Sequence, residues 1–209
     1  MFEKKVKIQI KSLAGNLLFE YECADNTIKK TVMEAISKKA DLSSANLRFA
    51  DLRFADLSSA DLSSANLSSA NLSSADLSSA DLSSANLRFA KNLPEWFINV
   101  CSRDIYFIFK TLKKEIPFLK DKLLKGEIDG TQYKGDCACL IGTLANADGG
   151  VDKVCGAIPF YDKGLHNWGE VWFYNIRKGD KPETHQFAKQ VLDIIIMIEN
   201  EDKVSKKKK

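Results

Sequence analysis

The stretch that decides the fold runs from Ala40 to Phe89 and reads ADLSS-ANLRF-ADLRF-ADLSS-ADLSS-ANLSS-ANLSS-ADLSS-ADLSS-ANLRF. It contains ten consecutive copies of one five-residue unit, Ala-(Asp/Asn)-Leu-x-x, without a change of register. The following residues shift the leucine by one place, and Pro94 ends the pattern.

A period of five fits neither a helix nor a flat strand. An α-helix turns about 100° per residue, so leucines five residues apart would be spread around it. In a flat strand they would alternate between the two faces. The pattern therefore predicts that the chain turns a corner in every unit and returns each leucine to a shared interior, as in a solenoid.

These units resemble the pentapeptide-repeat family. The resemblance implies a right-handed quadrilateral parallel β-helix with four units per coil, so ten units would give about two and a half coils with a height of about 12 Å. Both x positions should face solvent. The side chains expected to point inward are Leu42, Leu47, Leu52, Leu57, Leu62, Leu67, Leu72, Leu77, Leu82 and Leu87.

The second position of each unit is restricted to Asp or Asn. With twenty residues per coil, Asp41, Asp61 and Asp81 would share one face, and Asn46, Asn66 and Asn86 the next. We expect stacked Asn side chains to form an amide ladder. We also expect the Asp oxygens to accept backbone N–H groups in the turns, which would relieve their repulsion. Because residues 40–90 contain no glycine, turns with a positive φ are disfavoured.

Only two pairs occupy the outward positions. Seven units have Ser-Ser, and three have Arg48-Phe49, Arg53-Phe54 and Arg88-Phe89. Such uniformity favours a consensus array made by design over a recent tandem duplication. The phenylalanines suggest either a binding patch or contact with the flanking segments. We favour the second interpretation, because exposed large apolar groups need a partner.

The segments on either side of the repeats have the character of terminal caps, which solenoids require. Residues 1–39 predict a β-hairpin, with strands around Val6–Ile10 and Leu17–Cys23, and a helix from Ile28 to Ile36 that Asp25 or Asn26 would cap. This arrangement resembles the leader of many phage and bacterial pentapeptide-repeat proteins.

Residues 91–202 predict a C-terminal capping domain of the α+β class that is mainly helical. We expect a helix that begins at Asp104, a buried helix over residues 137–145 and a final helix that begins near Pro182. The basic residues 203–209 are interpreted as a disordered tail.

No residues present a strong pattern for chemistry. Zinc ligands would have to come from Cys137, Cys139, Cys155, His166 and His185, but Cys-x-Cys is a poor spacing and the cysteines lie among apolar residues. Cys137 after Asp136 would be the candidate nucleophile, and nothing selects either histidine as its base. We expect no catalytic residue, metal or cofactor.

The leading hypothesis is a non-catalytic structural protein in the cytoplasm, built as a consensus repeat scaffold. The chain has 209 residues, a net charge of +3 and an odd number of cysteines, which argues against a secreted disulfide framework. It has no membrane-length apolar run and no secretory leader, so a membrane partner is not expected.

Two alternatives place the function elsewhere. Some pentapeptide-repeat proteins imitate DNA and bind topoisomerases, and a C-terminal ligand-binding domain is the second alternative. The repeats carry six Asp and three Arg, a net charge of only −3, which weakens the first. A protein partner, or self-association, through the solenoid surface is compatible with the Arg-Phe pairs, and nucleic acid is not an expected partner.

Overall fold

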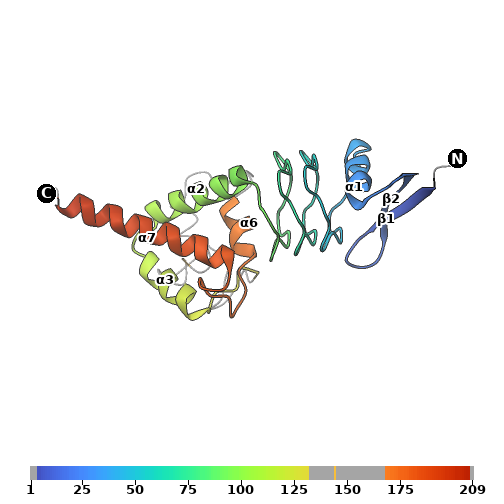
Figure 1. Ribbon diagram of the computed structural model, residues 1–209. Coiled ribbons are helices and arrows are strands. Elements are labelled where there is room, and N and C mark those ends of the chain that lie inside the picture. Colours follow the sequence, from blue (N-terminus) through green and yellow to red (C-terminus); the bar gives the residue numbers. More distant parts are fainter. Residues whose placement is uncertain (1–3, 132–143, 145–167, 208–209) are drawn as a thin grey trace. The chain divides into compact units, whose positions relative to one another are not determined.

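The computed structural model describes residues 4–131, 144 and 168–207 (Figure 1). The chain divides into two compact units, Met1–Ile98 and Asn99–Lys209. This boundary falls just after the start of helix α2 (Glu95–Thr111). The domain limits predicted at residues 39, 90 and 202 remain predictions.

Residues 40–91, here called the repeat column, stack on themselves at intervals of twenty residues. Parallel bridges pair Asn46 with Asn66, Asp61 with Asp81, and Asn71 with Lys91. The last of these pairs extends the stacking two residues beyond the final repeat. The register of twenty residues predicted from the repeats is therefore confirmed, and Figure 1 shows the chain stacking on itself after α1.

The interior of the repeat column is aliphatic. All ten repeat leucines are buried, with exposed fractions of 0–2%. The alanines of the units from Ala45 onward are buried as well. Burying a leucine stabilises a fold by roughly 1.5–3 kcal/mol, so the leucine stack is the main apolar contribution to this unit.

Each backbone N–H of the central unit, residues 65–69, has an acceptor. The alanine N–H closes the preceding turn, and the asparagine N–H donates to the layer before. The leucine and second outward N–H groups donate to the layer after, and the first outward N–H donates to the asparagine side chain. For the N–H groups of residues 65 to 69, taken in sequence order, the acceptors are Leu62 O, Ala45 O, Asn86 O, Asn66 Oδ1 and Arg88 O, at 2.8–3.0 Å. Buried backbone groups need such partners, so the unit is closed both within and between layers.

The Asp/Asn restriction has a direct cause. In all ten units the side-chain Oδ1 accepts the N–H of the residue two positions later, at 2.8–3.4 Å. This confirms the expected turn bonds. Hydrogen bonds from the side chains and backbone N–H groups of Ser43 and Ser58 lower the pKa of Asp41 and Asp56, respectively. Asp and Asn are interchangeable here because the position requires only an acceptor oxygen.

The predicted amide ladder is not formed. Within the described residues, Asn46, Asn66 and Asn86 make no side-chain hydrogen bond to one another. Each oxygen turns toward the N–H of its own unit instead, at 3.4, 3.0 and 3.1 Å. The local turn bond therefore decides the orientation of these amides, and stacking along the column does not.

The prediction about the corners is also wrong. The second outward residue has a positive φ of 54–60° in every unit, although it is Ser or Phe and never Gly. A hydrogen bond from each following alanine closes the turn, as from Ala50 N to Leu47 O at 3.1 Å. A positive φ at the third residue of a four-residue turn is the mark of a type II turn. In six of the ten units the N–H of this residue also donates to the next layer, as from Phe49 N to Ser68 O, which helps to offset the intrinsic cost of a left-handed residue.

A β-hairpin covers the N-terminal end of the repeat column. Strand β1 (Lys5–Lys11) pairs antiparallel with β2 (Leu17–Ala24), and Gly15 with a φ of 88° lies in the turn between them. Asn46 N donates to Lys11 O at 2.8 Å, and Leu13 N donates to Ser44 O at 2.9 Å. These bonds occupy the edge of the first layer, which an uncapped solenoid would leave unpaired.

Helix α1 (Ile28–Ser37) connects the hairpin to the repeats. Its N-cap is Thr27, whose side chain accepts the N–H of Lys30, so the prediction of Asp25 or Asn26 as the cap is wrong. Asn26 instead donates to Tyr21 O at 2.8 Å and ties the loop to β2. Val32 and Ala35 are fully buried.

The second unit contains the rest of α2 together with α3 (Ile116–Lys125), α6 (Trp168–Tyr174) and α7 (Gln186–Lys207). Their core includes buried side chains from each of these helices: Cys101, Ile105, Phe109, Leu119, Leu123, Phe173, Phe187, Val191 and Ile195. Ion pairs join α7 to α2 and α3, with Lys110–Glu201 at 2.8 Å and Lys120–Glu199 at 2.7 Å. Figure 1 shows α7 running beside both helices.

Several boundaries in this unit differ from the predictions. Helix α2 begins at Glu95, not at Asp104, because the apolar pattern starts with Phe97 and Cys101. Helix α7 begins at Gln186 rather than near Pro182. It continues to Lys207, so the described residues of the predicted disordered tail are helical. The predicted buried helix over residues 137–145 lies outside the described residues except for Leu144, which is helical and buried.

Candidate interaction surface on the repeat column

The twenty-residue register brings two of the three Arg-Phe pairs onto one face. Phe49 N donates to Ser68 O at 3.0 Å, and Ser69 N donates to Arg88 O at 2.9 Å. The pairs at 48–49, 68–69 and 88–89 therefore lie one above another. Since stacked strands are about 4.8 Å apart, the two Arg-Phe pairs are about 9.6 Å apart along the column, with Ser-Ser between them.

The three phenylalanine rings are among the most exposed apolar groups of the described residues. Phe49, Phe54 and Phe89 expose 65%, 69% and 59% of their surface. The N-terminal hairpin therefore leaves these rings exposed, and their contact with the C-terminal segment stays a prediction. Side chains at the outward positions project sideways from the column, whereas the hairpin meets the column at its end. Such exposure is unusual for side chains of this size.

The arginines of the shared face stack on their own phenylalanines. Arg48 Cζ lies 4.5 Å from the centroid of the Phe49 ring, and Arg88 Cζ lies 5.2 Å from that of Phe89. These are cation–π distances. Ser68, between the two arginines in the stack, is only 9% exposed although it occupies an outward position.

The third pair behaves differently. Arg53 Nε and Nη2 donate to the two oxygens of Asp51 at 2.8 and 2.7 Å, a bidentate ion pair. Hydrogen bonds from the Arg53 side chain and backbone lower the pKa of Asp51 to about 2. The Arg53-Phe54 pair belongs to the next face, because Arg53 shares a register position with Ser73. The six predicted contact residues are thus two stacked pairs and one separate pair.

The residues considered for metal binding or catalysis lie almost entirely outside the described part. This holds for Asp136, Cys137, Cys139, Cys155 and His166. His185 is described and 4% exposed, with Nε2 at 3.6 Å from Asp180 Oδ2. The described residues hold no group of three or more His, Cys, Asp or Glu side chains suited to a metal ion.

Cys101 is a buried thiol in α2 that the sequence did not single out. Burial, together with the charge of nearby Asp104, raises the pKa of Cys101 well above its usual value. Burial also raises the pKa of Asp104, whose environment includes a hydrogen bond from the backbone of Trp168. A protonated, enclosed thiol is a packing group and a poor nucleophile.

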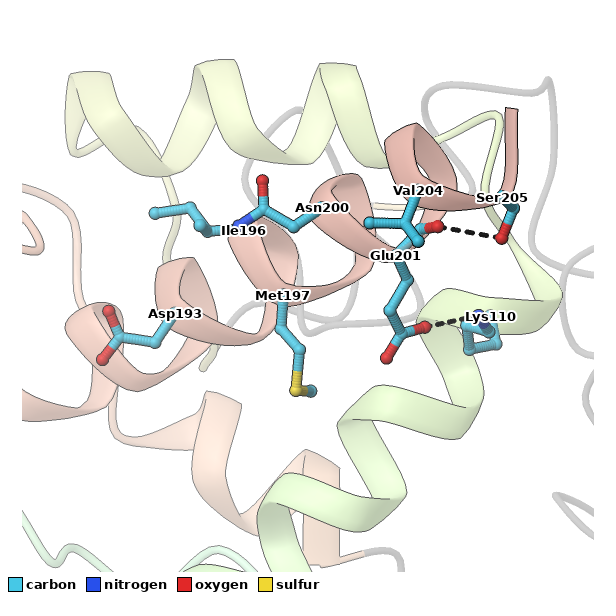
Figure 2. Close-up of a pocket in the computed structure, with 8 residues that line it drawn as sticks. All are labelled: Lys110, Asp193, Ile196, Met197, Asn200, Glu201, Val204 and Ser205. Atoms are coloured by element: carbon cyan, nitrogen blue, oxygen red, sulfur yellow. Dashed lines mark hydrogen bonds and ion pairs between the residues drawn. The ribbon is translucent and has the colours of Figure 1, made fainter. Parts of the chain in front are cut away.

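Two shallow hollows occur among the described residues. The first lies on α7 and is lined by Asp193, Ile196, Met197, Asn200, Glu201, Val204 and Ser205, with Lys110 from α2. Figure 2 shows Lys110 directed at Glu201, and their ion pair measures 2.8 Å. Glu201 also accepts from Tyr106 Oη at 3.0 Å. Both partners reduce its availability to a ligand.

The second hollow lies at the end of the repeat column. It is formed by Ser73, Ser74, Ala75 and Asp76 of the repeats and by residues 92–96, including Glu95 and Trp96. Asn92 Nδ2 donates to Asn71 Oδ1 at 3.3 Å and links the segment after the repeats to the column. The hollow is a feature of the column end.

Within the part of the chain that the structure describes, no helix has the length and apolar character required to cross a bilayer. No match to the chain was found among curated proteins or among solved structures. A model of the family of pentapeptide repeats matches residues 40–78 and 60–91, with eight copies. Such repeats imply a right-handed β-helix and are typical of structural or interaction proteins. The repeat column of this chain is a pentapeptide-repeat segment.

Proposed function

We propose that this protein is a non-catalytic scaffold whose repeat column is a quadrilateral β-helix of about two and a half coils, with an array of consensus origin. Its role is to hold outward side chains at fixed positions. The observation that carries this proposal is the closure of the central unit, in which five N–H groups have five acceptors and the leucine is fully buried.

The restriction of the outward positions to two residue pairs supports the same proposal. Ser-Ser and Arg-Phe pairs occupy the outward positions with the same backbone conformation, since φ at the second position varies only between 54° and 60°. Surface chemistry is therefore independent of the fold of each unit. A catalytic site would require several different reactive groups brought together, whereas this surface offers hydroxyl, guanidinium and phenyl groups in a regular array.

Insertion of whole units tests the scaffold proposal. We expect four extra Ala-Asp-Leu-Ser-Ser units after Ser79 to add one coil, keep the twenty-residue register and increase stability, because nearest-neighbour interfaces are added. The measurements are urea unfolding and a crystal structure of the extended chain. A chain that loses cooperative unfolding after this insertion would refute the scaffold proposal. Insertion of one unit is the comparison, because it moves every later unit to a different face.

A further inference from the structure

Helix α7 carries apolar side chains on the face opposite its core. Val191, Ile195 and Ile198 point into the second unit and are 0–1% exposed. Because a helix turns about 100° per residue, Asn200 lies near the centre of the opposite face, and it is exposed. The apolar residues within about 60° of Asn200 around the helix are Ile196, Met197 and Val204, which expose 41%, 45% and 53% of their surface. The outer face of a surface helix is ordinarily polar, so this one calls for a partner.

The exposed face of α7 is one wall of the first hollow described above. Figure 2 shows its side chains along the helix, with the ion pair between Lys110 and Glu201 at one edge. That ion pair occupies the edge alone. At the centre, Asn200 makes no side-chain hydrogen bond with any described residue.

The face is complementary to a copy of itself. Ile196 lies four residues before Asn200, and Val204 lies four residues after it. In two antiparallel α7 helices that cross at Asn200, Ile196 of one copy would meet Val204 of the other. Met197, three residues before Asn200, would lie along the methylene stem of Lys203, three residues after it. Each contact would occur twice, as a twofold interface requires.

The charges favour the antiparallel orientation. Asp193 lies toward the start of the face, and the exposed Lys203 and Lys206 lie toward its end. An antiparallel pair places Asp193 of each copy near Lys206 of the other, whereas a parallel pair places like charges together at both ends. Asp193 pairs with Lys189 of its own helix at 2.5 Å, but its side chain remains 49% exposed. A carboxylate accepts several donors, so a second cation fits beside it.

We propose that α7 binds α7 of a second copy of this chain, in antiparallel orientation, with the two Asn200 side chains at the twofold axis. An amide has both donor and acceptor groups, so two of them can hydrogen-bond to each other across the axis. A polar residue at such a position fixes the register of paired helices. The proposal goes beyond the scaffold function, because α7 belongs to the second unit and the repeat column to the first.

Two other occupants fit the face less well. An anionic membrane surface would attract Lys203 and Lys206, but it would repel Asp193, which lies in line with the apolar side chains. An acidic helix of another protein would meet the same aspartate as a like charge. A second copy supplies opposite charges at both ends of the contact.

The contact is small, so the dimer is expected to be weak. From Asp193 to Lys206 the face extends over about 20 Å of helix, which buries less than a standard protein interface. Exposed ion pairs also contribute little each. We expect a dimer Kd on the order of 100 μM.

The test is sedimentation equilibrium of the full chain from about 10 μM to about 1 mM, a range that brackets this Kd. The variant I196S/V204S should raise the Kd at least about tenfold. Both side chains are exposed, so folding is expected to be retained, and an unchanged thermal midpoint would verify it. The matched control is L124S, because Leu124 of α3 is 41% exposed and lies outside this face. It should leave the Kd within about twofold.

Charge exchange tests the orientation. D193K and K206E each replace two attractive contacts of the antiparallel dimer by repulsive ones, so each should raise the Kd about fivefold. An equimolar mixture of the two variants should form a dimer with a Kd within about twofold of the parent, since opposite charges then meet at both ends. In a parallel dimer each variant would exchange one like-charge pair for another and leave the Kd unchanged.

Several results would overturn the proposal. They are a chain that stays monomeric up to about 1 mM, equal effects of I196S/V204S and L124S, an unchanged Kd in both charge variants, or a mixture that does not restore the dimer. A monomeric chain that binds phosphatidylserine vesicles through Ile196 and Val204 would assign the face to a membrane instead. A partner helix in place of the second copy would likewise leave the purified chain monomeric.

Discussion

Replacing Ser79 by glycine is expected to stabilise the repeat column, whereas the same replacement at Ser78 is expected to destabilise it. The two serines are adjacent, both exposed, and belong to the same unit. They differ in backbone conformation, because Ser79 has a φ of 56° and Ser78 does not lie in the left-handed region. The pair therefore isolates the cost of a left-handed residue that carries a side chain.

The magnitudes follow from this difference. A non-glycine residue in the left-handed region costs about 1–2 kcal/mol, which glycine removes. Glycine also loses about 0.5–1 kcal/mol through the greater freedom of the unfolded chain. Ser79→Gly should thus gain about 0.5–1 kcal/mol, and Ser78→Gly should lose about 0.5–1 kcal/mol. The difference between the two variants, about 1–2 kcal/mol, is free of the unfolded-state contribution.

The measurement is urea unfolding of the full chain together with hydrogen exchange at the Ala80 amide. This amide donates to Leu77 O at 3.1 Å and closes the turn that contains both serines. Ser79→Ala serves as a control that removes the hydroxyl and keeps the strained conformation, so it should give no gain. If Ser79→Gly is no more stable than Ser78→Gly, the left-handed corner is not a source of strain and the reasoning fails.

Three further predictions follow from the turns and from the second unit. Asn66→Ala should cost about 1 kcal/mol in urea unfolding, because the Ser68 N–H loses its acceptor, whereas Asn66→Asp should be nearly neutral at neutral pH; equal losses would contradict the acceptor role. The Asp51–Arg53 pair lowers the pKa of Asp51 to about 2, so its contribution is present above about pH 4 and is lost as the pH falls through 2. The urea midpoints of Asp51→Asn and the parent chain should accordingly differ at pH 6 and converge near pH 2, and a constant difference would refute this. Gly130→Ala should destabilise the second unit by about 3 kcal/mol or more, because the added Cβ would lie 1.8 Å from Phe173 O; unchanged thermal unfolding would show that the loop can move away.

The sequence predicted the stacking register because a strict period leaves few ways to bury every leucine. The same reasoning identified the acceptor role of the Asp and Asn oxygens, since short side chains bond to nearby backbone. The corners could not be predicted from composition, because Ser and Phe adopt a positive φ here without glycine. In this column the N–H of each following alanine closes the turn in all ten units, and the corner is left-handed in every one.

The interaction surface was predictable only in part. The six Arg and Phe residues stood out by their chemistry, but their grouping depends on comparing residues twenty apart. That comparison also reveals the asparagine column beneath the arginines, which the sequence offered and which was interpreted only as a ladder. The boundaries of α2 and α7 were missed because capping signals at Asp104 and Pro182 were weighted above the apolar periodicity around them.

In the repeat column, the position of a residue in the sequence decides both the face and the layer on which its side chain lies. A step of five codons moves a side chain to the adjacent wall, and a step of twenty moves it up by one storey on the same wall. Reordering the units would therefore change the pattern of charged and aromatic groups on the outside. The aliphatic interior would stay the same, because every unit contributes the same Ala and Leu. Many exterior patterns can therefore arise by such variation while each intermediate sequence still folds.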